Sequence, residues 1–153
     1  MLELKSVSKA FGMIVVASDI DIGYMADLQA PNLEVRRIDV LSDPMEEAAF
    51  DFVAARALLH HFPDRESALK RMVGAVKPGG RFLSIEPDML PCTAAEPESM
   101  RAFWRAWMNR SEQSGIDYYV GRTIPAWLDT LGLEGVEGEG HTPLFNGGSA
   151  WAT

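Results

Sequence analysis

The stretch Lys77-Pro78-Gly79-Gly80-Arg81-Phe82-Leu83-Ser84-Ile85-Glu86 indicates the fold of this chain. A helical pattern leads into it, because apolar residues recur at three- and four-residue spacing over 65–76. Pro78 disfavours the helical conformation of the residue before it, and the glycine pair supplies the backbone freedom for a sharp reversal. Residues 81–86 then form an apolar segment. A helix, a tight turn and a buried strand in this order predict a βαβ crossover in a parallel sheet.

Three apolar, β-branched segments before this crossover predict further buried strands, over 13–18, 33–39 and 51–55. Asp64 is expected to cap the helix over 65–76, since its carboxylate can accept a backbone N–H of the first turn. The alternation of apolar strands with amphipathic helices predicts an α/β fold. We expect a Rossmann-like, doubly wound and mostly parallel sheet with helices on both faces.

The segments after Glu86 predict helices and weak strands. Residues 87–97 are rich in proline and small residues, which favours a loop. Thr123 is expected to cap a second helix that ends at Gly132, and residues 133–141 and 148–153 show weak strand signals. A first helix is predicted by large apolar residues at helical spacing: Met100, Phe103, Trp104, Trp107 and Met108. This stripe is expected to pack on the sheet as core, with pocket lining as the alternative, and its helix to cover the site.

Composition limits the possible functions. At 153 residues the chain suits one domain, and 22 acidic against 14 basic residues argue against non-specific nucleic-acid binding. Cys92 is the single cysteine, so we expect neither an internal disulfide nor a thiolate metal site. No apolar segment reaches the roughly eighteen residues of a membrane span. The first residues lack the pattern of a signal peptide, so a cytoplasmic location is the default expectation.

The segment from Phe50 to Glu86 carries a more specific pattern. A strand opens with Phe50-Asp51-Phe52-Val53, a Leu59-His60-His61 turn follows, and then come the helix, the Lys-Pro-Gly-Gly sequence and a strand. This combination resembles the second half of class I S-adenosylmethionine-dependent methyltransferases. The resemblance implies one domain over 1–153, with a cofactor-binding half at 13–86 and a helical cover with late strands at 87–153. It also implies S-adenosylmethionine as the cofactor.

Acidic residues follow several of the predicted strands, where ligands bind in open parallel sheets. A carboxylate there can accept hydrogen bonds from both hydroxyls of a ribose. The resemblance gives Asp19 this ribose role, with Ile20 beside the adenine, whereas a helix cap or a solvated loop acid is the alternative for Asp19. It implies that Asp39 lies near the adenine amino group with Val40 against the ring. It implies finally that Ala55 and Arg56 face the methionine part of the cofactor.

The residues offer only weak candidates for catalysis. An imidazole titrates near neutral pH, but in the resembled family the histidine pair usually supports the turn. His61, His141 and Asp88 are the candidates that remain. The sequence shows no catalytic triad and no metal cluster, and methyl transfer needs neither, because alignment with an activated sulfonium can supply most of the catalysis.

The pattern departs from the family before Met13. The family has a first, central strand and a glycine-rich loop there, whereas residues 1–11 contain no glycine and favour a helix. We therefore expect a truncated or mis-started form that binds S-adenosylmethionine poorly. A sheet without its central strand should expose an edge, so homo-oligomers through that edge are also expected.

Three functions remain open at this point. The first is methyl transfer to an unidentified, small-molecule acceptor. The second is a non-catalytic methyltransferase-like module for association. The third is NAD-dependent oxidation and reduction, which an acid at a strand end also suits, although the glycine fingerprint of that class is missing.

Overall fold

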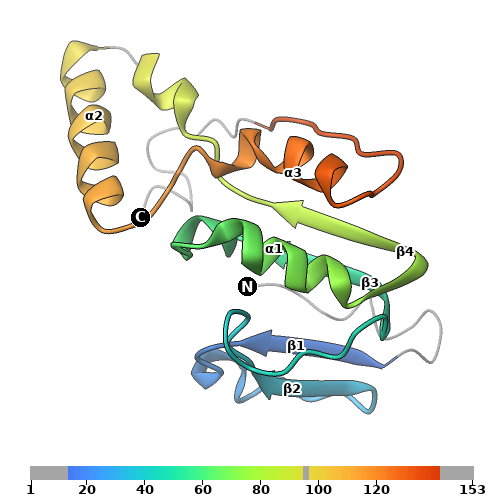
Figure 1. The fold of residues 1–153 in the computed structure, drawn as a ribbon. Coiled ribbons are helices and arrows are strands. Elements are labelled where there is room, and N and C mark those ends of the chain that lie inside the picture. Colours follow the sequence, from blue (N-terminus) through green and yellow to red (C-terminus); the bar gives the residue numbers. More distant parts are fainter. Residues whose placement is uncertain (1–13, 95–96, 142–153) are drawn as a thin grey trace.

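The computed structural model describes residues 14–94 and 97–141 (Figure 1). Its strands are β1 (Val15–Asp19), β2 (Leu33–Arg37), β3 (Phe50–Arg56) and β4 (Val76–Ile85). Its α-helices are α1 (Arg65–Gly74), α2 (Glu98–Gln113) and α3 (Ile124–Thr130). Short 3-10 helices are η2 (Gly23–Met25), η3 (Leu59–His61), η4 (Leu90–Ala94) and η5 (Val120–Arg122). The predicted α/β class is confirmed, and each of the four strands predicted over 13–86 overlaps an observed one.

The strands form two parallel pairs. β1 pairs with β2 from Val15 opposite Leu33 onward, and β3 pairs with β4, with Arg56 opposite Ile85. All four strands run in the same direction, and β1 and β3 are the facing members of the two pairs (Figure 1). Within the described residues no strand joins the two pairs, so the predicted single sheet is divided here.

The glycine pair of the opening stretch has a different role from the one predicted. Helix α1 ends at Gly74, and residues 76–80 already belong to β4. The register moves from Phe50 opposite Val76 to Phe52 opposite Arg81, so the extra residues form an irregularity inside the strand rather than a separate turn. Gly79 has a φ of +78°, and a Cβ on Gly80 would lie 2.9 Å from the carbonyl oxygen of Asp51, so a side chain at either position would be strained.

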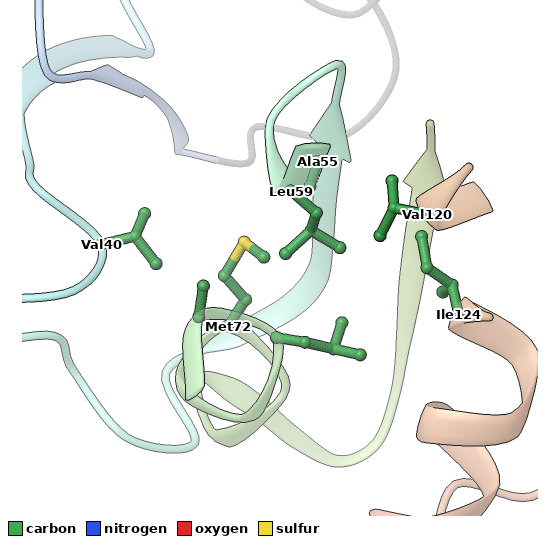
Figure 2. Close-up of a cluster of buried hydrophobic side chains, with 8 residues drawn as sticks. Val40, Ala55, Leu59, Met72, Val120 and Ile124 are labelled. Carbon is green, nitrogen blue, oxygen red and sulfur yellow. The ribbon is translucent and has the colours of Figure 1, made fainter. Parts of the chain in front are cut away.

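The core lies between α1, β3 and α3. Asp64 accepts the N–H of Ser67 at 3.1 Å, which confirms the predicted cap of α1. The apolar side of α1 packs against residues of β3, η3, η5 and α3 (Figure 2). Val40 approaches this cluster from the chain that follows β2 (Figure 2). The buried cluster comprises Val40, Ala55, Leu59, Ala68, Leu69, Met72, Val120 and Ile124.

Helix α2 does not pack as predicted. Met108 is buried, but Met100, Phe103 and Trp107 are 41%, 50% and 46% exposed. The prediction that this stripe forms core is therefore wrong for most of its members. The reason is the position of the helix, which lies beyond the ends of the strands rather than over a face of the sheet (Figure 1).

Two local predictions in the later segments are also wrong. Thr123 forms no side-chain cap on α3, because its hydroxyl donates to the carbonyl of Val120 at 2.8 Å instead. Residues 133–141 form no strand. Gly132 follows α3 with a φ of +80°, as its predicted role at the helix end requires. The predicted helix over 1–11 and strand over 148–153 lie outside the described residues.

Candidate functional site

A cavity of about 500 Å³ lies between the two strand pairs. It extends from the carboxyl ends of β1 and β3 along the strands to the side chains of Met72 and Ala75, at the end of α1. All the residues that the sequence suggested as cofactor contacts line this one cavity: Asp19, Ile20, Asp39, Val40, Ala55 and Arg56. The fold thus brings together residues that are up to 37 positions apart in the chain (56 − 19 = 37).

Asp19 is the last residue of β1. Its Oδ1 accepts the N–H of Asp21 at 3.0 Å, and the carboxylate of Asp21 in turn accepts the N–H of Gly23 at 2.9 Å. These bonds hold the chain in a tight turn after the strand. Within residues 14–94 and 97–141 the hydrogen bond to this carboxylate is made at Oδ1, so Oδ2 can serve a ligand.

Asp39 lies two residues beyond β2, in a turn that its own carboxylate holds. Oδ1 accepts the N–H of Leu41 at 2.9 Å, while the N–H of Asp39 donates to Asp43 at 2.8 Å. The bonds from Leu41 and Ser42 hold the pKa of the Asp39 carboxyl below its usual value. The carboxylate is therefore ionised at neutral pH and partly occupied by its own turn.

The Leu-His-His turn is fixed by a buried acid. Both Leu58 and Leu59 donate their N–H groups to Oε1 of Glu86 at 2.8 Å. Oε2 of Glu86 lies 2.9 Å from Nδ1 of His60. Glu86 is thus a structural residue of the site, and the sequence signal for it was an acid directly after a buried strand.

His61 is the one catalytic candidate from the sequence that lines the cavity. His61 is exposed overall, but partial desolvation of its ring lowers its pKa, and the neighbouring His60 acts in the same direction. A neutral imidazole at neutral pH can accept a proton, which is the property that a general base needs.

The other two catalytic candidates lie away from the cavity. The carboxylate of Asp88 forms a two-oxygen ion pair with Arg122 at 2.8 Å. His141 is exposed at the end of the described chain. Asp88 and His141 do not line the cavity. No residue of α2 lines it either, so this helix does not form the predicted cover over the site.

Sequence analysis missed several of the lining residues. Arg36 reaches the cavity while it is held by Glu34 at 2.7 Å and Glu46 at 2.8 Å. Ala57 lines the cavity at the end of β3 with a φ of +50°, a left-handed conformation that costs an alanine about 1 kcal/mol. Neither a paired arginine in a strand nor an alanine signals a binding site, so no sequence pattern could have found them.

The described ranges hold neither a cluster of metal-ligating side chains nor a membrane-spanning helix. No three His, Cys, Asp or Glu side chains of residues 14–94 and 97–141 lie together as a metal site would require. No helix in the same ranges is long and apolar enough to cross a membrane.

Comparison with known proteins identifies the family. Residues 3–84, more than half of the chain, match the family model described as "Methyltransferase domain". The chain belongs to the class I S-adenosylmethionine-dependent methyltransferase family. The methyltransferase match covers β1 to β4 and therefore nearly all the elements that form the cavity.

Curated methyltransferases show the same relationship. "Methyltransferase str2" of Strobilurus tenacellus is 30% identical over 102 residues, which are 65% of this chain and 37% of that protein. "Demethylmenaquinone methyltransferase" of Mycolicibacterium paratuberculosis is 28% identical over 126 residues, 80% of this chain and 55% of that protein. The chain thus spans about half or less of the length of these relatives.

A solved structure supports the fold. The crystal structure of a proposed methyltransferase from Bacillus halodurans superposes with a TM-score of 0.55 at 16% identity. The match covers 84% of this chain and 66% of that one. At this identity the likeness concerns the fold, which is the Rossmann-like α/β architecture of class I methyltransferases.

Proposed function

We propose that this chain binds S-adenosylmethionine at the carboxyl ends of β1 and β3 and transfers its methyl group to a small-molecule acceptor. The proposal rests on the observation that Asp19, Asp39 and Arg56 all line the same cavity. Asp19 ends β1, Asp39 follows β2 and Arg56 ends β3. These two acids and one cation suit a ligand that has a ribose, an adenine and a charged amino-acid part.

Several groups that line the cavity suit this cofactor. The available oxygen of Asp19 can accept a ribose hydroxyl. Ile20 and Val40 supply apolar surface for the adenine ring, and the guanidinium of Arg56 can pair with the cofactor's carboxylate. Bound S-adenosylmethionine would supply a methyl group already activated by its positive sulfur. The contribution of this chain is then to bind, to orient and to exclude water.

His61 is the base in this proposal. The imidazole lines the same cavity, and its lowered pKa keeps it neutral at physiological pH. It can take the proton of a hydroxyl or amine acceptor as the new bond to carbon forms. The apolar side chains of Phe62 and Met72 line the cavity as well and favour an acceptor with an apolar part.

Calorimetric titration of the purified chain with S-adenosylmethionine tests the proposal. The Asp19→Ala variant should bind about 10- to 150-fold more weakly, the range for a lost charge-assisted hydrogen bond. Asp27→Ala is the matched control, because Asp27 is exposed and does not line the cavity. Equal affinity for Asp19→Ala and the parent would remove Asp19 from the site.

A parallel measurement separates the proposal from the oxidoreductase alternative. The melting temperature of the chain should rise with S-adenosylmethionine and stay constant with NAD. Release of S-adenosylhomocysteine in the presence of small hydroxyl and amine acceptors would then report transfer, and His61→Ala should lower its rate. A rise in melting temperature with NAD alone would contradict the proposal.

A further inference from the structure

The segment of residues 38–49, between β2 and β3, forms one wall of the cavity and is attached to α1. At its far end the N–H groups of Ala48 and Ala49 donate to the carbonyls of Gly74 and Ala75, both at 2.9 Å. These bonds join the segment to the C-terminal end of α1, so the position of this wall depends on the helix. The residues of the segment that line the cavity are Ile38, Asp39, Val40, Met45 and Glu46.

Arg71 of α1 makes a second attachment, near the middle of the segment. Its guanidinium donates a hydrogen bond from Nη2 to the main-chain carbonyl of Asp43. Nε of the same guanidinium is buried and meets no acceptor among residues 14–94 and 97–141, so this part of the group is withdrawn from water. Arg71 precedes Met72, which lines the cavity, but Arg71 itself does not line it. The arginine therefore supports the wall from outside the cavity.

Asp43 connects Arg71 to Asp39. Oδ2 of Asp43 accepts the N–H of Asp39 at 2.8 Å, and Oδ1 of Asp39 accepts the N–H of Leu41 at 2.9 Å. The main-chain carbonyl of Asp39 accepts the N–H groups of Ser42 at 3.2 Å and Asp43 at 2.9 Å. Residues 39–43 thus form a compact turn that begins just after β2 and is fastened to Arg71 at its other end. This turn fixes the direction of the Asp39 carboxylate.

The carboxyl of Asp39 reports whether this turn is closed. Its pKa is lowered first by the N–H of Leu41 and then by the bonds from Ser42, with the charge of Arg37 as a smaller cause. Arg37 also lies 3.8 Å from Oδ2 of Asp43. An open turn would lose the hydrogen bonds that lower this pKa. Arg71 reaches the turn through a main-chain carbonyl, so it acts on Asp39 through geometry rather than through direct charge.

We propose that Arg71 is a positioning residue of the cofactor site, which holds the turn of residues 39–43 so that Asp39 and Val40 keep their places in the cavity. The inference rests on the proposed function for its ligand, S-adenosylmethionine, whereas the turn itself belongs to the free chain. A site that is already ordered costs less free energy to occupy. Loss of the Arg71 contact therefore weakens cofactor binding, although no group that touches the cofactor is removed.

Titration of the carboxyl groups by carbon-13 NMR tests the proposal on the full chain without cofactor. Arg71→Met removes the guanidinium and keeps a good helix former, and the pKa of Asp39 should then rise toward its ordinary value. Asp64 is the internal reference, because bonds from Ser67 lower its pKa at the other end of α1, and it should titrate as in the parent. Lys70→Met removes a charge from an exposed position of the same helix and should leave Asp39 unchanged. An equal pKa of Asp39 in Arg71→Met and the parent would overturn the proposal, as would an equal shift of Asp64.

Calorimetric titration with S-adenosylmethionine is the second measurement. Arg71→Met should bind about 3- to 10-fold more weakly than the parent, the range for one lost hydrogen bond, and Lys70→Met should bind as the parent does. Arg71→Lys keeps the charge and a donor, so it should recover most of the affinity and the low pKa of Asp39.

The outcomes separate this inference from the proposed function. If Arg71→Met does not fold, Arg71→Gln takes its place, because its shorter side chain keeps a polar end but loses the reach to Asp43. Equal affinity of the Arg71 variant and the parent would overturn the positioning role. Failure of every chain to bind S-adenosylmethionine, with the Asp39 shift intact, would reject the cofactor and support the hold of Arg71 on the turn.

Discussion

The side-chain carboxylate of Glu86 has no solvent-exposed surface and lies 2.9 Å from Nδ1 of His60. Glu86 follows β4 directly and His60 lies in η3, just after β3. The contact therefore connects the carboxyl ends of two paired strands. It also fixes the turn that carries His61 into the cavity.

Removal of this carboxylate should destabilise the fold. Glu86→Ala leaves the N–H groups of Leu58 and Leu59 without their acceptor, and we expect a loss of about 3 kcal/mol or more in the free energy of unfolding. Glu86→Gln keeps one acceptor oxygen and should lose roughly half as much. Urea unfolding followed by circular dichroism measures both. Glu139→Ala, at an exposed position, is the control and should change stability by less than about 0.5 kcal/mol.

Substitution by alanine should change stability by different amounts at Gly74, Gly79 and Gly80. Gly80→Ala brings a Cβ to 2.7 Å from the side chain of Val76 and 2.9 Å from the Asp51 carbonyl, so we expect a loss of about 1–3 kcal/mol. Gly79→Ala meets no neighbour but must adopt a φ of +78°, which costs about 1 kcal/mol. Gly74→Ala at the end of α1 has open space and should be neutral or stabilising. Thermal melts of the three variants give the order, and a tolerated Gly80→Ala would contradict the close approach.

Asp39 should contribute a pH-dependent part of the stability. Its pKa is lowered in the folded chain, first by the bond from Leu41, so the unfolded chain binds the proton more tightly. The contribution is present above the unfolded pKa of about 3.9 and is lost as the pH falls through the lower folded value. The stability difference between the parent and Asp39→Asn should therefore be largest at neutral pH and shrink below about pH 4. A stability difference for Asp39→Asn that stays constant with pH would contradict the assignment.

Sequence periodicity predicted the local elements of this fold well. Apolar β-branched runs located β1 to β4, and the Asp64 cap and the helical spacing located α1, because these signals depend on neighbours in the chain. Periodicity did not predict the division into two strand pairs, because strand pairing joins segments that are distant in the chain. The exposed stripe of α2 was mispredicted for a similar reason. Helical spacing gives an apolar face, but the place where the helix docks decides whether that face is buried.

The candidate site shows the same limit. The acids at strand ends could be predicted, because ligands of parallel sheets bind there. Glu86 belonged to the same pattern and yet is closed off by His60 and two backbone amides. Asp19, Asp39 and Glu86 look alike in sequence, because each lies at or after the end of a strand. Only the burial of Glu86 in the folded chain shows that it is a structural acid.

The buried cluster lies entirely in the part of the chain that follows β2. Apart from Val40, its residues come from β3, η3, α1, η5 and α3, and none comes from β1 or β2. The side chain of Arg71 in α1 also donates a hydrogen bond to the carbonyl of Asp43, in the segment that follows β2. The β1–β2 pair can therefore separate from the rest at less cost than global unfolding, as a cooperative unit of its own. Native-state hydrogen exchange should find the amides of this pair in a low-energy opening, while those between β3 and β4 exchange only when the whole chain unfolds.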